Sequence, residues 1–245
     1  MFTSILLSRL KKAYQICIIT GYDMAIESGA PKIHQEDRSW NNYNIAKLAT
    51  RNALQNKSDN FWEFYHSIRK ALKNIKPNLG HYSLVDIEQM FKKFYLITMN
   101  EYNLHRIAGN QRVAELNGNV TRSRCIKCDY IRNEDIKNYN LSGTIKCPKC
   151  GSLLRPDVVL LDEQIPQRTI EAVNQAAATS EVFISIGVSH TLKVVENLPY
   201  VAKGNGAYLL EINKQETELT AHANEFVKGD SGKILPHLVT ALTDS

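Results

Sequence analysis

The chain has 245 residues, of which 43% are hydrophobic, and a formal net charge of +5 at pH 7. This length and composition fit a globular protein built as one large domain or as a large domain with inserts. No apolar run approaches the roughly 20 residues that cross a bilayer, and the 30 basic residues are scattered among 25 acidic ones. We therefore expect a cytoplasmic protein that neither enters a membrane nor binds nucleic acid specifically.

Along the chain, predicted strands alternate with predicted helices. Residues 1–15 predict a helix and not a signal peptide, because the basic residues follow the short apolar patch. Apolar runs rich in β-branched residues predict buried strands at 15–20, 94–98, 157–161, 181–187 and 207–213. Helical patterns cover 59–75, 81–94, 167–179 and 233–242. The alternation predicts an α/β protein with an open parallel sheet that binds ligands at the carboxyl ends of its strands.

Two cysteine pairs interrupt this alternation. Cys125 and Cys128 form the first CxxC motif, and Cys147 and Cys150 form the second. Each motif can turn two thiolates toward one ion, and two such motifs complete the tetrahedron that structural zinc prefers. The site leaves no ligand position open, so we expect zinc to hold a small ribbon together instead of taking part in chemistry.

The turn after the first predicted strand is a weak nucleotide signal. A dinucleotide site favours glycines there, because bare backbone N–H groups can approach a pyrophosphate at a helix N-terminus. In the stretch TGYDMAIESGAPKIH only Gly21 and Gly29 remain, and Tyr22 and Asp23 lie between them. On these residues alone, an ordinary strand-to-helix turn is an equally good interpretation.

Short segments along nearly the whole chain, taken together, resemble the sirtuin family. In sirtuin order and spacing the chain carries TG and ESGAP near its start, LIT followed by an asparagine, LHRIAG, EL followed by Gly118, the two CxxC motifs, RPDVV, GVS, IN and LP. The resemblance implies a large Rossmann-like domain made of residues 1–34, 81–119 and 157–245. It also implies a small domain in which a helical insert, 35–80, joins a zinc-ribbon insert, 120–156.

The resemblance implies NAD-dependent removal of acyl groups from protein lysines. The segments LATRNA, WEFYH and PNLGH are most similar to the desuccinylase and demalonylase branch, which removes acidic acyl groups. That branch binds the acyl carboxylate with a tyrosine and an arginine. Tyr65 matches the tyrosine, but Ile68 occupies the position of the arginine. A bidentate partner for a carboxylate is therefore absent at that position.

Asn117 departs from the family at a reactive position. In sirtuins a histidine in a Glu-Leu-His-Gly-like motif takes a proton from a ribose hydroxyl after nicotinamide has left, and the resemblance aligns Asn117 with it. An amide does not titrate near neutral pH, so Asn117 cannot supply general-base help, which is typically worth about 10²–10⁴-fold. His105 is the nearest histidine in sequence, but family members carry a histidine there as well, and we expect it to be structural.

The cofactor positions are only partly retained. The family's Gly-Ala-Gly loop becomes Gly21-Tyr22-Asp23, which places a ring and a carboxylate where a diphosphate would approach. Tyr102 replaces an aspartate of the nicotinamide pocket. By resemblance the remaining NAD contacts come from Gly21, Glu27, Asn100, Gly187, Ser189, Asn213 and Ser231, and Asn100 also belongs to the catalytic set. We expect NAD binding to be weak.

These departures favour a catalytically degenerate sirtuin, a pseudoenzyme that serves as a binding or regulatory module with a nucleotide, an acyl-lysine peptide or a protein as its partner. One alternative is residual NAD-dependent chemistry, as a deacylase, an ADP-ribosyltransferase or an NAD hydrolase. Another is a working deacylase with an unconventional base. The identity of the partner and the oligomeric state stay open.

Overall fold

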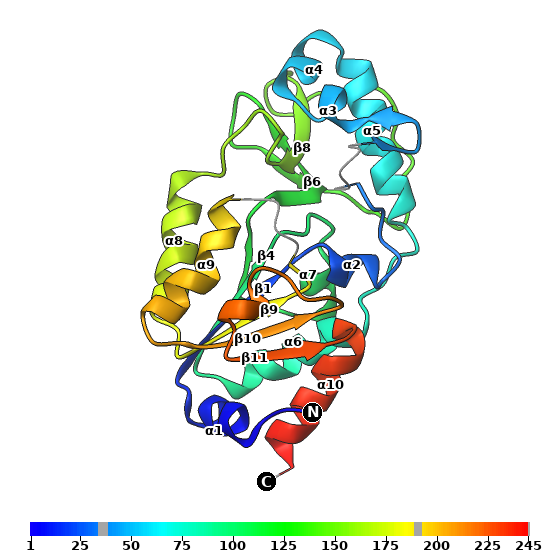
Figure 1. The fold of residues 1–245 in the computed structure, drawn as a ribbon. Helices are drawn as coiled ribbons and strands as arrows, with labels where there is room; N and C mark the ends of the chain where they lie inside the picture. The colour runs from blue at the N-terminus through cyan, green and yellow to red at the C-terminus, as the bar shows by residue number, and fades with distance from the viewer. Residues whose placement is uncertain (34–38, 189–192, 245) are drawn as a thin grey trace.

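The computed structural model describes residues 1–33, 39–188 and 193–244. Its centre is a parallel sheet of six strands in the order β11-β10-β9-β1-β4-β5 (Figure 1). These strands are β1 (Gln15–Thr20), β4 (Lys93–Thr98), β5 (Val113–Glu115), β9 (Val182–Ile186), β10 (Tyr208–Asn213) and β11 (Glu225–Lys228). Thr20 of β1 lies opposite Thr98 of β4 and Ile186 of β9, so these strands end together at one edge.

Helices cover both faces of this sheet (Figure 1). On one face lie α1 (Ser4–Lys12), α6 (Leu79–Met90) and α10 (Ser231–Thr243), and on the other lie α8 (Gln167–Ala178) and α9 (Lys193–Gly204). The side chains of β1 divide between the two cores: Ile16 and Ile18 face the first, and Cys17 and Ile19 face the second. A strand buried on both faces needs apolar residues throughout, which explains the continuous run in β1.

A smaller part of the molecule lies beyond the carboxyl edge of the sheet. It contains an antiparallel sheet in the order β7-β6-β8, with β6 (Gly118–Cys125), β7 (Ile131–Asn133) and β8 (Leu154–Val158). Beside it lie α3 (Ile45–Leu48), α4 (Arg51–Asn56), α5 (Ser58–Ala71) and a ribbon of β2 (Ser39–Trp40) and β3 (Tyr43–Asn44). Trp62 of α5 and Leu154 of β8 belong to one buried apolar cluster, so the helices and this small sheet share a core.

Arg69 of α5 joins the helices to β6. Its side chain is fully buried, and its guanidinium donates to Val120 O at 2.8 Å, to Arg122 O at 2.9 Å and to Ser123 Oγ at 2.9 Å. The carboxylate of Glu134 lies 3.4 Å away. A buried guanidinium is stable only when its donors are satisfied in this way, so Arg69 fixes the orientation of α5 against the small sheet.

Local sequence explains where several helices begin. Thr3, Asn44 and Thr50 precede α1, α3 and α4, and each side-chain oxygen accepts a backbone N–H of the first turn. At α6, Asn78 accepts from the His81 N–H, and the His81 ring accepts from the Asn78 N–H, which closes a capping box.

The predicted fold class is confirmed: the protein has an α/β fold with a Rossmann-like parallel sheet, a four-cysteine module and a helical module. One predicted strand is misplaced, because residues 154–158 form β8 of the small antiparallel sheet and residues 157–161 are no strand of the parallel one. The edge strands β5 and β11 and the helix α9, which contains Pro199, were not predicted. The division into two domains stays a prediction.

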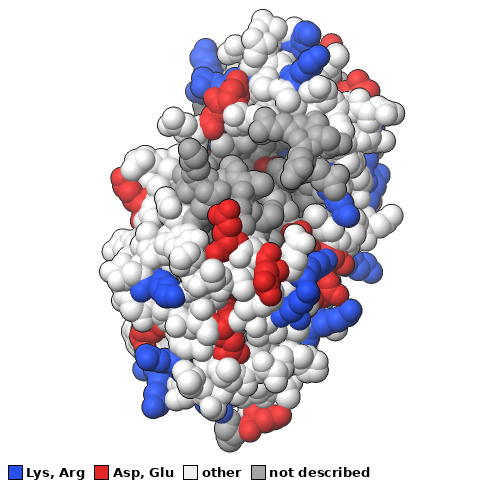
Figure 2. Space-filling model, viewed as in Figure 1, with Lys and Arg blue, Asp and Glu red and all other residues white. Residues whose placement is uncertain are grey.

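Within the described residues, no helix is both long and apolar enough to span a bilayer. Figure 2 shows basic and acidic side chains close to one another over the face that it presents. The charges on this face therefore balance locally.

Candidate active site

Loops that follow β1, β4, β9 and β10 meet at the carboxyl edge of the parallel sheet (Figure 1). Backbone hydrogen bonds continue past the strand ends, where Gly21 N–H donates to Ile186 O at 2.9 Å and Gly187 N–H donates to Ile212 O at 2.9 Å. From the loop after β4, Asn100 Nδ2 donates to Gly21 O at 2.6 Å. Ligands of open α/β sheets bind at this edge, so these loops define the candidate site.

Two glycines of the edge are required by the close approach of the backbones. A Cβ at Gly21 would lie 1.9 Å from Gly187 O, and Gly187 itself has a φ of +55°. Asp23 lies against Gly187, because a Cβ added there would be 2.9 Å from Asp23 Cβ. Burial raises the pKa of the Asp23 carboxyl, and Lys214 acts in the opposite direction.

Asn100 offers an unused acceptor inside the site. Its Oδ1 is buried and has no hydrogen-bond partner among the residues that the structure describes. Buried polar atoms are normally paired, so this oxygen marks a place where a ligand can present a hydroxyl or amide donor. A dinucleotide carries such donors in its ribose hydroxyls and its nicotinamide amide. The residues present therefore fit a nucleotide.

Asn117, between β5 and β6, is held by two hydrogen bonds. Its Nδ2 donates to Met99 O at 3.0 Å and to the Tyr22 hydroxyl at 2.8 Å. Because a backbone carbonyl can only accept, the NH₂ group must face Met99, and this fixes the orientation of the amide. In this orientation the amide presents its acceptor, Oδ1, on the side away from Met99 O and the Tyr22 hydroxyl. It can orient a hydroxyl of a ligand but cannot take its proton.

A buried histidine lies close to the same strand ends. His105, in α7 (Leu104–Ala108), contacts Thr20 Oγ1 through Nε2 at 2.9 Å, and Thr20 Oγ1 lies 3.0 Å from Thr98 Oγ1. The His105 and His81 rings are 4.8 Å apart. Burial lowers the pKa of both imidazoles, that of His81 to about 4. Both rings are therefore neutral at pH 7, the form that can accept a proton.

Glu101 is a site residue that the sequence reasoning missed. It directly follows Asn100, it is only 7% exposed, and burial raises the pKa of its carboxyl to about 8. A single glutamate in a loop belongs to no periodic pattern and no spacing motif. The signal that could have found it is its position beside Asn100 at the end of a buried strand, where an ionisable side chain faces the ligand edge.

Two residues predicted to contact the cofactor, Glu27 and Ser231, are bonded to each other, and their contact with a cofactor stays a prediction. The Glu27 carboxylate accepts from Ser231 N at 3.1 Å, from Ser231 Oγ at 2.8 Å and from Gly232 N at 3.0 Å. Glu27 thereby caps the N-terminus of α10. Asn213 is also at the edge, where its Nδ2 donates to Val188 O at 3.2 Å. Ser189, the other predicted contact, lies outside the described residues.

A polar cleft opens beside Asn117 toward the small sheet. Its volume is about 870 Å³, and its lining includes Glu115, Arg122, Asp157, Val159 and Arg168. Arg122 forms ion pairs with both acidic side chains, at 2.6 Å to Glu115 and 3.0 Å to Asp157. Asn117 lies next to this lining, since its neighbours Leu116 and Gly118 belong to it and Asn117 O accepts from Val159 N at 2.8 Å. The cleft therefore adjoins the candidate site.

The predicted zinc ligands come together as expected. Cys125 Sγ lies 3.5 Å from Cys150 Sγ, Cys128 Sγ lies 3.7 Å from Cys147 Sγ, and all ligand atoms are within 4.8 Å of one another. Tetrahedral zinc with Zn–S bonds of about 2.3 Å holds its sulfurs about 3.8 Å apart. The four thiolates therefore fit a closed zinc site, remote from the carboxyl edge of the large sheet.

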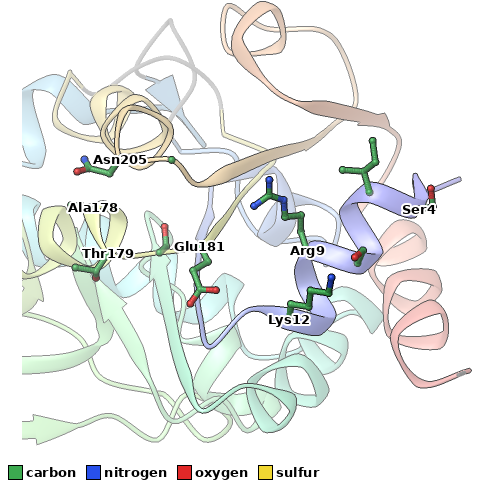
Figure 3. Close-up of a pocket in the computed structure, with 11 residues that line it drawn as sticks. Ser4, Arg9, Lys12, Ala178, Thr179, Glu181 and Asn205 are labelled. Atoms are coloured by element: carbon green, nitrogen blue, oxygen red, sulfur yellow. The ribbon is translucent and has the colours of Figure 1, made fainter.

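Another cavity, of about 750 Å³, lies at the opposite edge of the sheet (Figure 3). Arg9 and Lys12 of α1 line one side, and Thr179, Glu181 and Asn205 line the other. None of the predicted site residues lies in it, so it is separate from the candidate active site.

Comparison with known proteins identifies the family. Residues 21–194 match the model of the Sir2 family. The chain belongs to the sirtuin (Sir2) family. Among solved structures, a Sir2 homologue in complex with NAD is 28% identical, with a TM-score of 0.90 over 100% of this chain and 95% of its own. A mutant Sir2 homologue in complex with ADP-ribose is 29% identical, with a TM-score of 0.89 over 99% and 97% of the two chains.

Curated relatives of this sirtuin are NAD-dependent protein deacylases. The one from Thermococcus sibiricus is 37% identical over 228 residues, which cover 90% of this chain and 88% of the relative. The one from Pyrococcus furiosus is 35% identical over 234 residues, or 94% of each chain. The deacylase from Aquifex aeolicus is 37% identical over 215 residues, which cover 87% of this chain and 89% of its own.

These relatives correct the functional expectation drawn from Asn117. The prediction of a catalytically degenerate binding module, a pseudoenzyme, is wrong: sirtuins this similar over nine-tenths of the chain are deacylases, and a buried histidine, His105, bonds Thr20 in the site. The error came from treating one aligned position as decisive for the whole site. Assignment to the branch that removes acidic acyl groups, and the degeneracy of individual motifs, stay predictions.

Proposed function

We propose that this sirtuin is an NAD-dependent protein-lysine deacylase. The observation that carries the proposal is the similarity of nearly the whole chain to NAD-dependent protein deacylases, 37% over 228 residues in one case. NAD, when bound, supplies the electrophilic ribose carbon that takes the acyl oxygen. The protein has to bind and orient the dinucleotide, bind the acyl-lysine beside it and accept a proton from a reacting hydroxyl.

Binding of the dinucleotide is proposed at the carboxyl edge. Gly21 and Gly187 bring the loops after β1 and β9 into contact there, Asn213 lies at the end of β10, and Asn100 Oδ1 is a buried acceptor without a partner among the described residues. Tyr102 need not block this space, since its hydroxyl donates to Pro31 O at 2.9 Å and its ring belongs to the buried core of the small part.

The acyl-lysine is proposed to enter through the polar cleft beside Asn117, with an uncharged acyl group. Ile68, at the position of the carboxylate-binding arginine of the acid-specific branch, is fully buried in an apolar cluster. Two arginines affect Tyr65 electrostatically, but both are already paired: Arg155 with Glu163 at 2.6 Å and Arg69 with Glu134 at 3.4 Å. An acyl carboxylate would therefore find no free cation among them.

The test compares an acetyl-lysine peptide with the same peptide carrying succinyl-lysine, each with and without NAD. We expect the acetyl group to be removed only when NAD is present, and the succinyl group to be removed more than tenfold more slowly. Faster removal of succinyl would contradict the proposed preference. Removal of neither group by folded, zinc-loaded protein would contradict the function itself.

A further inference from the structure

Glu101 is a buried acid for which the described contacts give no structural use. Its backbone is fixed, because Glu101 O accepts from Val120 N of β6 at 2.8 Å. Within residues 1–33, 39–188 and 193–244, its carboxylate makes no hydrogen bond and no ion pair. A buried carboxylate without a partner is costly, and such groups persist mainly where a reaction or a ligand uses them.

The surroundings of Glu101 come from several elements. Its charge raises the pKa of three tyrosine hydroxyls: Tyr22 ahead of α2 (Asp23–Ile26), Tyr65 of α5 and Tyr102 of its own loop. The charged groups Arg155, Glu163 and Arg69 act on Tyr65. The pKa of Glu101 itself is raised by burial alone, to about 8. Among the residues that the structure describes, no cation therefore holds this carboxyl in its ionised form.

Glu101 and Asn117 lie against the same short loop after β4, because Asn117 Nδ2 donates to Met99 O at 3.0 Å, two residues before Glu101. The Tyr22 hydroxyl accepts the hydrogen bond from Asn117 Nδ2, and the same tyrosine lies within the field of Glu101. Asn117 Oδ1 can accept from a ligand hydroxyl and hold it in place, yet an amide cannot remove the proton. Close to that hydroxyl the site then needs a second group that titrates near neutral pH.

We propose that Glu101 is a proton-carrying catalytic residue of this deacylase, acting on a ligand hydroxyl that Asn117 orients. The O–H bond of that hydroxyl breaks, its electron pair stays on the ligand oxygen, and a new O–H bond forms on the Glu101 carboxylate. The proton then passes to water, which restores the carboxylate. This inference rests on the proposed deacylase function. His105 is a separate group, bonded to Thr20 Oγ1 at 2.9 Å.

The first experiment measures kcat against pH from 6 to 10 for the wild type, Glu101→Gln and the exposed control Glu216→Gln, with acetyl-lysine peptide and NAD. We expect the wild type and the control to gain activity as the pH rises through about 8. In Glu101→Gln this rise of kcat with pH, the pH limb, should be absent, and kcat should be lower by about 10²-fold or more. An active wild type whose pH limb persists in Glu101→Gln would overturn the proposal.

The second experiment separates chemistry from structure. In Glu101→Ala, added formate should restore part of the lost rate, because a small carboxylate can enter the space left by the side chain. Glu101→Asp should keep the pH limb at a reduced rate. Loss of activity in Glu101→Ala that formate does not restore at any concentration, with Glu101→Asp equally inactive, would indicate a structural role and overturn the proposal.

A third readout needs neither cofactor nor turnover. Infrared difference spectra of the wild type between pH 6 and pH 10 should show a protonated carboxyl that ionises with an apparent pKa near 8 and that is missing in Glu101→Gln. Absence of such a band in the wild type would overturn the proposal. A wild type that shows the band but deacylates no peptide would instead refute the deacylase function.

Discussion

The pKa values of the buried acidic and basic residues at the carboxyl edge shift in opposite directions for one physical reason. Removal from water disfavours the charged form of any group, so it raises the pKa of the Glu101 carboxyl and lowers the pKa of the His81 and His105 imidazoles. All three are therefore mainly neutral at pH 7. The edge can bury these groups together because, near neutral pH, none of them has to carry a full charge.

The neutral histidines predict an acid sensitivity. A histidine whose folded pKa is depressed contributes stability that is present above its unfolded pKa of about 6.5 and is lost as the pH falls through that range. For His81 the loss extends to about pH 4. We expect the Tm of the wild type to fall over this interval, and to fall less in His81→Gln. Thermal melts of both proteins from pH 8 to pH 4 measure this fall in Tm.

The control for this prediction is His237→Gln, which changes an exposed histidine of α10. Its melting curve should follow the wild type at each pH. If His81→Gln follows the wild type equally closely, the His81 imidazole is not the source of the acid sensitivity.

Residues differ in how much of their role a sequence can reveal. The zinc cysteines were predicted fully, because CxxC spacing brings two ligands together within one turn. Glu27 and Ser231 were assigned to the cofactor, yet they bond each other across 204 positions, a pairing that only the fold produces. Glu101 lies between two family positions, Asn100 and Tyr102, but at a position to which the resemblance assigned no role. Asn117 was given too much weight for function, and its role in the site stays a prediction.

At the scale of elements, the N-terminus of α10 is capped by a side chain that lies near the other end of the sequence. Its N-cap residue, Asp230, makes no side-chain capping bond, and the Glu27 carboxylate takes the exposed N–H groups instead. A carboxylate at this end also matches the helix dipole. The loop after β1 is thereby tied to the last helix, which supports the same edge of the sheet.

Glu27→Ala tests this cap. It leaves the N–H groups of Ser231 and Gly232 without their acceptor, so we expect a loss of about 1–3 kcal/mol of unfolding free energy and a Tm lower by several degrees. Glu27→Gln should lose less, because the amide oxygen still accepts. Chemical denaturation without any nucleotide measures the effect, with the exposed Glu216→Ala as control. A Glu27→Ala variant of wild-type stability would show that Glu27 is chiefly a ligand contact, as first predicted.

Elements were predictable where their pattern was long. The central strands β1, β9 and β10 are buried runs whose composition indicates a parallel sheet, and α5, α8 and α10 are marked by helical spacing. The edge strands β5 and β11 have three and four residues, too few for a pattern. The apolar run at 157–161 was assigned to the wrong sheet, because a buried strand has the same apolar sequence pattern in a parallel and in an antiparallel sheet.

At the scale of the whole molecule, zinc supports the small part that closes over the site. The four cysteines join the β6–β7 turn to the segment before β8, and Cys125 and Cys147 belong to the core that includes α5. Protein purified without chelators should hold about one zinc per chain. Cys147→Ser should lose zinc and melt earlier, whereas Cys17→Ala, in the large sheet, should keep its zinc. Full zinc content in Cys147→Ser would contradict the site.

The arrangement of the two parts explains how a sirtuin can act with an amide at Asn117. The large sheet presents the nucleotide edge, the small part forms the polar cleft, and Asn117 lies where they meet with both of its N–H donors occupied. Proton transfer then depends on neighbouring groups that burial has tuned, and not on one aligned position.

The most direct test of the account is the stoichiometry of NAD consumption and acetyl-lysine deacetylation by the wild-type, zinc-loaded protein. We predict one NAD consumed for each acetyl group removed, with no deacetylation when NAD is omitted. NAD consumption that continues equally without the peptide, or no deacetylation at any pH from 6 to 10, would contradict the conclusion that this sirtuin is a deacylase.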